Sequence, residues 1–240
     1  MFHRDRICAI IKDDGSILTD DTDKANEFNR YFASVRVADN GHLPVYNSLI
    51  DDQNCLTSLV IEEPDVLLAI NSMKSSLSCP DDLPPTMFKK LKYVIVRPLT
   101  VVFNQLLSVA AVSAEWKKAV IIPVLKKGSA GSVTNYRPIS LTSVPSKILE
   151  CVLSRKITEY LLNNNLISDA QHGFLKRRSN CTNLLQCIDD CSLSTELGFQ
   201  TVVVYIDFAK DFGTVSHSKR LHKLYYYGIR DILLSWFKCF

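Results

Sequence analysis

Asp207 is the residue whose place in the sequence most clearly suggests chemistry. It follows residues 201–206, a run of β-branched and aromatic residues that predicts a buried strand. An ionised carboxylate is costly to bury, so at the end of such a strand it should face a cation or a hydrogen-bond donor. Taken alone, a capping or salt-bridged Asp is the default interpretation, and a metal ligand is the alternative.

Basic residues are concentrated in the middle of the chain. Residues 117–178 contain 11 Lys and Arg against 3 Asp and Glu, whereas residues 1–116 contain 11 against 16. This middle segment is suited to a polyanion such as a nucleic acid, because phosphate contacts are made by Lys and Arg. The charge alone is equally compatible with a solvated face.

Hydrophobic periodicity and turn residues predict an α+β chain that is rich in helices. Strands are predicted at residues 7–11, at 120–125 and from Tyr136 onward, with a flexible Gly- and Ser-rich tip at 128–132. Pro98 is expected to separate two helices. The predicted helices cover residues 24–35, 63–73, 86–91, 99–111, 146–163, 182–197, 216–228 and a stretch from about 231.

Eight cysteines without a Cys-x-x-Cys pair indicate reduced thiols in an intracellular protein. Cys187 and Cys191 lie one helical turn apart and could bind zinc with His217 or His222, but buried core thiols are the favoured alternative. No apolar run approaches the roughly 20 residues of a membrane-spanning helix, and no secretory leader is visible. We therefore expect no membrane partner.

Four blocks of sequence together resemble the reverse transcriptase of LINE-like (non-LTR) retrotransposons. Their order and spacing match that family from about Ala119 to the last residue. The blocks are the Asp207 segment, Asn-Tyr-Arg-Pro-Ile-Ser-Leu at 135–141, Gln-His-Gly-Phe-Leu-Lys-Arg-Arg-Ser at 171–179 and Tyr-Gly-Ile-Arg at 227–230.

The resemblance implies a fragment of a right-hand polymerase, with fingers and palm, that is helix-rich and has a small, mainly antiparallel sheet. It also implies a division of the chain. Residues 1–50 would be a connector that normally follows an endonuclease domain, and residues 51–115 a helical N-terminal extension. Residues 116–200 would be the fingers with a basic template- and nucleotide-binding face, and residues 201–240 the start of the palm.

The resemblance further implies a metal site. Asp207 and the backbone carbonyl of Phe208 would hold Mg²⁺, with two ions in the complete enzyme and Mn²⁺ as a possible substitute, since such ions prefer oxygen ligands. In the family the remaining carboxylates come from an aromatic-Ala-Asp-Asp hairpin downstream of Tyr-Gly-Ile. Residues 1–240 contain no Asp pair in such a context, so we expect no polymerisation by this chain alone.

The nucleotide would be held by basic groups of the fingers. Arg137 would grip the triphosphate with its planar guanidinium, and Lys126 and Lys127 would add charge at the finger tip. Phe212 would lie under the sugar and exclude a 2′-hydroxyl. The alternatives are a structural ion pair for Arg137, solvated lysines at the tip and a core aromatic for Phe212.

The template would lie along the Gln171–Ser179 block, where Lys176, Arg177 and Arg178 are the candidate contacts. Leu175 stands where Arg is usual, and these three residues could replace the lost charge, although alternate side chains of an extended strand face opposite ways. Two further departures lie beside Phe212, with Asp211 in place of Ala and Gly213 in place of Asp. An extra carboxylate near a triphosphate adds like-charge repulsion.

Three hypotheses about function follow. The favoured one is an RNA-directed DNA polymerase whose partners are an RNA template, a DNA primer and deoxynucleoside triphosphates, expected in the nucleus and cytoplasm. The second is a retroelement remnant that binds nucleic acid without catalysis. The third is a metal-dependent nuclease that uses Asp207 with another acid, which is disfavoured because no second carboxylate has a matching strand context.

Overall fold

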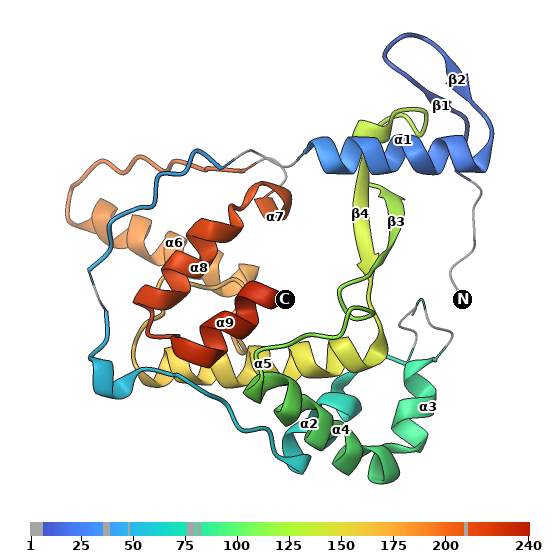
Figure 1. Ribbon diagram of the computed structural model, residues 1–240. Helices are drawn as coiled ribbons and strands as arrows, with labels where there is room; N and C mark the ends of the chain where they lie inside the picture. Colours follow the sequence, from blue (N-terminus) through green and yellow to red (C-terminus); the bar gives the residue numbers. More distant parts are fainter. Residues whose placement is uncertain (1–6, 36–38, 48, 76–79, 81–82, 209–210) are drawn as a thin grey trace.

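A helical body carries two small β-hairpins in the computed structural model of the protein (Figure 1). The structure describes residues 7–35, 39–47, 49–75, 80, 83–208 and 211–240, without the side chains of Asp211 and Phe212. Both hairpins are antiparallel and two-stranded. The fold is therefore the helix-rich α+β arrangement with little sheet that the sequence predicts.

The N-terminal hairpin and the first helix form one end of the molecule. Strands β1 (Ile10–Ile11) and β2 (Ile17–Leu18) pair around a turn and lead into α1 (Asp21–Ser34). Asp20 caps α1, because its carboxylate accepts hydrogen bonds from the backbone N–H groups of Thr22 and Asp23. The predicted strand at 7–11 is confirmed over its last two residues, and the predicted helix is confirmed.

The main core is built by α2 (Glu63–Ser72), α4 (Lys92–Ser108), α5 (Val144–Asn163) and α9 (Asp231–Cys239), together with α3 (Pro85–Lys90). Helix α2 packs against both α4 and α5, and α4 also contacts α9. Apolar side chains spaced at helical intervals meet in this core and are almost completely buried. They include Val66, Ile70, Phe103, Ile148, Val152 and Trp236.

The prediction that Pro98 separates two helices is wrong. Helix α4 runs through Pro98, and the break between α3 and α4 falls at Leu91 instead. A proline inside a helix removes one backbone hydrogen bond, which opposes this arrangement. Pro98 is exposed, however, whereas Val96 and Phe103 on the same helix are buried in the core. Packing of the apolar face thus outweighs the lost hydrogen bond.

An ion pair joins α2 to α5. The Nζ atom of Lys156 lies 2.8 Å from Oδ2 of Asp65, and both side chains are about four-fifths buried. The same carboxylate accepts the backbone N–H of Glu62 and so completes the capping box of α2. Burial raises the pKa of Asp65, but the hydrogen bonds from Lys156 and Glu62 outweigh it, and the net pKa lies below the ordinary value.

Replacing Lys156 by Met is expected to destabilise the fold at pH 7 by about 1–2 kcal/mol, because a partly buried carboxylate loses its charged donor. A carboxyl group with a lowered folded pKa contributes stability above its unfolded pKa of about 3.9 and loses it as pH falls through the folded value. The difference between wild type and Lys156→Met should therefore shrink between pH 5 and pH 3. Urea unfolding at several pH values measures this, and a difference independent of pH would contradict it.

The segment around Leu56 holds the C-terminal helices. Leu56 forms a parallel bridge with Ile229, which lies between α8 (His217–Tyr226) and α9. The backbone N–H of Leu56 donates to the carbonyl of Gly228 (2.8 Å), and that of Arg230 donates to the carbonyl of Leu56 (3.1 Å). Ser216 caps α8 by accepting the backbone N–H of Lys219, at the residue where the sequence predicts the helix to begin. The junction between these two helices is thus fixed by a residue far away in the sequence.

The predicted buried strand at residues 201–206 is wrong. These residues form no strand, and Val202, Val204 and Ile206 are each at least 74% exposed. β-branched residues build a strand only where a partner strand accepts their backbone hydrogen bonds. Within the described part of the chain no backbone group bonds to residues 201–208. They lie between α6 (Asn180–Glu196), which has no buried residue, and the short α7 (Asp211–Thr214).

Candidate nucleotide and template site

The fingers hairpin is formed by β3 (Val120–Leu125) and β4 (Tyr136–Leu141), as predicted. It stands between α1 at one end and α5 at the other (Figure 1). In its register Val124 lies opposite Arg137 and Leu125 opposite Tyr136, and the backbone N–H of Lys126 donates to the carbonyl of Asn135 (2.8 Å). Two 3₁₀ turns, η1 (Asp52–Asn54) and η2 (Val133–Asn135), complete the secondary structure, the second of them within the hairpin tip.

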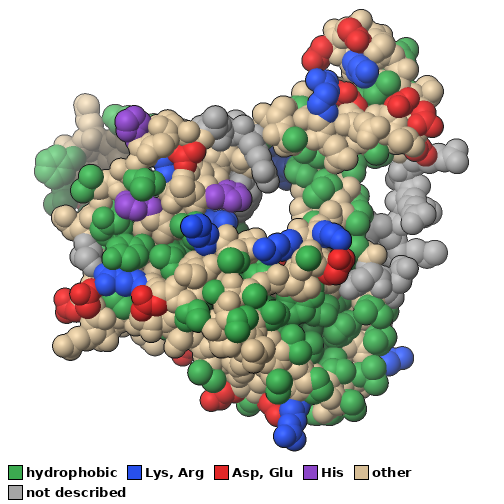
Figure 2. All heavy atoms as spheres, viewed as in Figure 1, with side chains coloured by type: hydrophobic (Ala, Val, Ile, Leu, Met, Phe, Trp, Pro, Cys, Tyr) green, Lys and Arg blue, Asp and Glu red, His purple; other side chains and the backbone are tan. Residues whose placement is uncertain are grey.

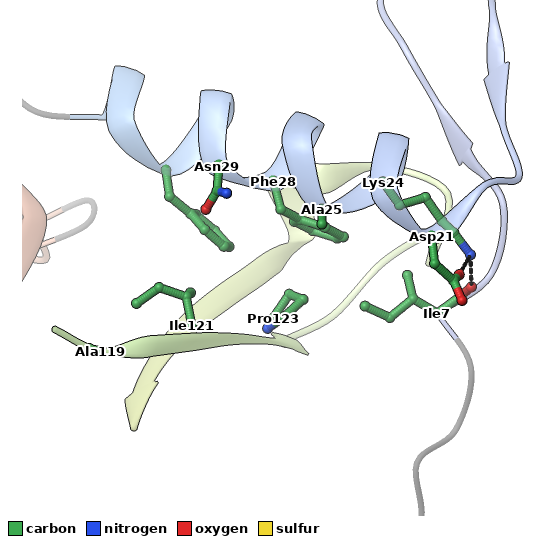
Figure 3. A pocket seen from close by; sticks show the side chains of 10 residues that line it. Ile7, Asp21, Lys24, Ala25, Phe28, Asn29, Ala119, Ile121 and Pro123 are labelled. Carbon is green, nitrogen blue, oxygen red and sulfur yellow. Dashed lines mark hydrogen bonds and ion pairs between the residues drawn. The ribbon is translucent and has the colours of Figure 1, made fainter. Parts of the chain in front are cut away.

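One face of the hairpin packs against α1. Tyr136 is buried there, with its ring 4.9 Å from that of Phe28 in an edge-to-face arrangement. Ile121 and Pro123 lie on the same side of the sheet and line a mostly apolar pocket of about 480 Å³ beneath α1 (Figure 3). An ion pair between Asp21 and Lys24 lies at one end of this pocket. This face is therefore used for packing.

The opposite face carries the predicted phosphate-binding groups. Because residues opposite each other in a ladder share a face, Arg137 is on the side of Val124, and Lys126 follows two residues later on the same side. Diagonal neighbours of this kind are separated by about 7–8 Å. Both side chains are exposed. We call this face, with Lys126 and Arg137, the basic face.

The tip beside the basic face is held by hydrogen bonds. The amide of Asn135 donates to the carbonyl of Ser129 (2.9 Å), and the hydroxyl of Tyr136 donates to the carbonyl of Ala130 (2.8 Å). Gly128 has φ +83°, and a Cβ there would lie 2.9 Å from the Asn135 side chain. Lys127 is exposed just before this glycine. A closed tip thus presents the two predicted lysines.

The space beside the hairpin is open. In the space-filling view an opening separates the hairpin from the helices on the other side of the molecule, and Lys and Arg side chains lie along its lower border (Figure 2). Cations bordering an open space attract polyanions over a distance of about 10 Å at moderate ionic strength.

Asp207 lies in the extended segment between α6 and α7. Its side chain is exposed and makes no hydrogen bond or ion pair with another described residue, and Phe208 beside it is 73% exposed. The described residues contain no cluster of three or more His, Cys, Asp or Glu side chains that fits a metal ion. The described residues therefore do not complete a metal site around Asp207.

The alternative zinc site gains no support. His222 makes a 2.9 Å contact through Nε2 with the carbonyl oxygen of Pro44, and the described residues hold no Cys and His cluster. Burial, and then the neighbouring Cys187, raise the pKa of the Cys191 thiol. A raised pKa favours the neutral thiol over the thiolate that binds zinc.

The predicted template block forms a loop with two tight turns, so the extended strand considered from the sequence is absent. Lys176 and Arg177 are exposed, but Arg178 is engaged within the chain. Its guanidinium donates to the carbonyl oxygens of Asp169 and Gln171, the latter at 2.9 Å. Of the three basic residues, two are thus presented to solvent and one holds the loop.

Phe174 lies in the same loop and is not among the candidate residues that the sequence indicates. Its side chain is 92% exposed, and its backbone has φ +64°. Gly-Phe in a turn is usually taken for a core aromatic, so no sequence pattern marked it. Only the solvent exposure in the structure shows that this aromatic side chain lies on the surface near Lys176 and Arg177.

The side chain of Phe212, predicted to lie under the nucleotide sugar, is outside the described residues. Its neighbour Gly213 is described, and a Cβ at that position would lie 3.2 Å from Cγ1 of Val35. The family residue there is Asp, so a side chain at 213 would require Val35 to move by a few tenths of an ångström. The glycine is thus consistent with close contact between α7 and the end of α1.

Comparison with known proteins identifies the class. Residues 124–240 match the family described as reverse transcriptase (RNA-dependent DNA polymerase). This part of the chain is therefore similar to reverse transcriptases, a family that generally uses divalent metal ions. No described helix has the length and hydropathy to cross a membrane.

A particular relative narrows this further. The chain is 27% identical over 163 residues to the "Probable RNA-directed DNA polymerase from transposon BS" of Drosophila melanogaster. The match covers 62% of this chain and 17% of that protein, so the chain spans a small part of its relative's length. The chain is thus similar to the polymerase of a transposon, in agreement with the resemblance to retrotransposon enzymes.

Proposed function

We propose that this chain provides the fingers and the start of the palm of an RNA-directed DNA polymerase of a non-LTR retrotransposon. The observation that carries the proposal is the basic face, where Arg137 and Lys126 lie exposed on one side of the fingers hairpin while the other side packs on α1. The match of residues 124–240 to the reverse transcriptase family supports it.

The basic face would bind the triphosphate of a deoxynucleotide. Arg137 offers two parallel N–H donors to phosphate oxygens, and Lys126 adds a point charge one diagonal step along the hairpin. Lys127 would contribute from the closed tip. Because Tyr136 packs against Phe28 on the opposite face, the hairpin is ordered before the nucleotide binds. Binding therefore costs little conformational entropy of the hairpin backbone.

Asp207 would be one ligand of the divalent ions that the family uses, with the carbonyl of Phe208 as a further oxygen ligand. When bound, Mg²⁺ or Mn²⁺ would stabilise charge on the reacting phosphate oxygens. The remaining ligands would come from the aromatic-Ala-Asp-Asp hairpin that the family resemblance implies. We therefore expect residues 1–240 alone to extend no primer, and primer extension by the purified chain would contradict this expectation.

The test uses a chimaera, called the joined protein below, in which the downstream palm of a related reverse transcriptase is fused to the C-terminus of this chain. In it Arg137→Ala is expected to raise the Michaelis constant for deoxynucleotides by about 10- to 100-fold, because charge-assisted hydrogen bonds contribute about 1.5–3 kcal/mol. Steady-state primer extension on an RNA template measures this constant.

The matched control is Arg97→Ala, which removes an exposed arginine from α4 and should leave the constant within twofold. An unchanged Michaelis constant in Arg137→Ala would contradict the proposal that the basic face binds the nucleotide.

A second function, RNA binding without catalysis, is favoured by one observation: the described residues contain no complete metal cluster. For a polymerase and for a binding protein alike, phosphate contacts make the logarithm of RNA affinity fall linearly with the logarithm of salt concentration. A joined protein that binds RNA with this slope but never extends a primer would support the binding function and contradict the polymerase.

A further inference from the structure

We propose that residues 201–206 form a self-association surface, at which two copies of this chain pair as antiparallel strands around a two-fold axis through Val204. This inference goes beyond the proposed function, because it concerns contact between copies and requires neither a nucleotide nor a metal ion. A second copy would supply the partner strand that this segment lacks within one chain.

One side of the segment presents apolar side chains to solvent. Val202, Val204 and Ile206 are 86%, 74% and 75% exposed. Figure 1 shows the segment as an open connection between α6 and α7. Because alternate side chains of an extended chain lie on the same side, these three residues form one continuous apolar strip.

The other side of the segment is turned toward α6. Val203 and Tyr205 line a shallow, mostly apolar pocket of about 550 Å³ together with Cys187, Ile188 and neighbouring residues of α6. Val203 is accordingly 43% exposed, the least of residues 202–206. Helix α6 thus lies beside one side of the segment, and no described strand pairs with its backbone.

The backbone of the segment is available for pairing. No backbone group in the described part of the chain bonds to residues 201–208. Unpaired N–H and C=O groups of an extended segment are a template for another strand. Residues 201–206 also contain no charged residue, no Pro and no Gly, which is the composition that favours pairing between identical segments.

The sequence of the segment is self-complementary in one antiparallel register. A two-fold axis perpendicular to a pair of strands places one residue opposite its own copy and keeps each side of the segment on one face. β-branched and aromatic side chains directly opposite each other stabilise such a pair. With the axis at Val204, the opposed pairs are Val204 with its copy, Val203 with Tyr205, and Val202 with Ile206.

Charge selects the antiparallel orientation of a second copy. Asp207 is the one charged residue between Leu197 and Phe208. The antiparallel register sets it opposite Thr201 of the other copy, whose hydroxyl can donate a hydrogen bond to the carboxylate. Parallel pairing in register would instead place the two Asp207 carboxylates side by side, and adjacent like charges destabilise a ladder. The partner that fits this surface is therefore an antiparallel copy of the chain.

Sedimentation velocity of the purified 240-residue chain tests this self-association. A reductant keeps the cysteines as thiols. Between about 1 and 100 µM, the range of weak specific association, the sedimentation coefficient should rise toward that of a dimer. Val204→Lys should weaken dimerisation at least about 10-fold, because two ammonium groups meet at the axis and two apolar side chains are lost.

Two variants serve as controls. Val204→Thr keeps the β-branched shape without a charge and should dimerise within about threefold of wild type. Val45→Lys makes the same charge change at a valine that is 94% exposed outside the segment, and it should dimerise as wild type does. Because both valines are exposed, none of these substitutions should alter the fold.

Crosslinking tests the register. Directly opposed residues of antiparallel strands have Cα atoms about 4.5–5.5 Å apart, which a disulfide can span. Val204→Cys chains oxidised with diamide should therefore become linked through position 204 of both copies. Val202→Cys chains should not, because their two sulfurs would be about 13 Å apart along the strands, but a mixture of Val202→Cys and Ile206→Cys chains should. Mass spectrometry of the digest distinguishes these links from any made by the natural cysteines.

Four results would overturn the inference. They are a chain that stays monomeric over the whole range, a dimer that Val204→Lys leaves unchanged, a link at position 202 as efficient as that at 204, and assemblies larger than a dimer. Each would leave the proposed function standing, because nucleotide binding and primer extension are measured separately in the joined protein.

Discussion

Asp207→Asn in the joined protein is expected to lower the rate of primer extension by about 10³-fold. The neutral amide has nearly the shape of the carboxylate but lacks the charge that holds a divalent ion, and a loss of about 4 kcal/mol of transition-state stabilisation corresponds to this factor. Affinity for RNA should not fall, because the negatively charged Asp207 carboxylate repels phosphates and makes no favourable contact with them. Single-turnover extension on an RNA template measures the chemical step.

A matched control is Asp189→Asn, which removes an exposed acid from α6 and should leave the rate unchanged. If Asp207→Asn extends primers at the wild-type rate, the carboxylate at 207 is not a metal ligand. A loss of activity in both variants would point to a general effect of charge instead.

Trp236→Ala is expected to reduce the free energy of unfolding by about 3–5 kcal/mol. The indole is 1% exposed in the main core, and its N–H donates to the carbonyl of Ala111 at 2.9 Å. The substitution creates a cavity and leaves that carbonyl without its donor. Because this hydrogen bond joins α9 to the segment that follows α4, α9 should also lose part of its attachment there.

Urea unfolding followed by circular dichroism gives this free energy. Phe199→Ala, with an exposed ring, should change it by less than about 0.5 kcal/mol. A cost below about 1 kcal/mol for Trp236→Ala would contradict the assignment of α9 to the core. Total stability of a domain is about 5–15 kcal/mol, so Trp236→Ala is also expected to unfold at a markedly lower temperature.

Local chemistry made much of the secondary structure predictable. Asp20, Ser216 and the Glu62–Asp65 capping box fix helix starts through bonds between near neighbours in the sequence. The β3–β4 hairpin could likewise be predicted from two apolar runs around a Gly-rich tip. In each case the interactions that decide the structure are encoded within a few residues.

Interactions between distant residues account for the failures. Residues 201–206 have strong β propensity, but a strand needs a partner, and propensity cannot show whether one exists. Pro98 marks a helix break in isolation, yet burial of Val96 and Phe103 in a core shared with α5 and α9 overrides it. Both outcomes depend on elements remote in sequence.

The candidate site shows the same division. The sequence and its family resemblance identified Arg137, Lys126 and Lys127 as candidates, but only the register with Val124 opposite Arg137 indicates that two of them share a face. Arg178 resembled its neighbours in sequence, and only its bonds to Asp169 and Gln171 distinguish it from Lys176 and Arg177. Side-chain partners are decided by the fold of the loop.

The most direct test of the fingers assignment is photo-crosslinking of the purified chain with a deoxynucleoside triphosphate that carries a photoreactive group on its γ-phosphate. After digestion, mass spectrometry locates the labelled peptide. We expect the label within residues 126–137, competed by unmodified deoxynucleotide and greatly reduced in Arg137→Ala. Labelling confined to other residues, or labelling of the hairpin that persists undiminished in Arg137→Ala, would contradict the assignment.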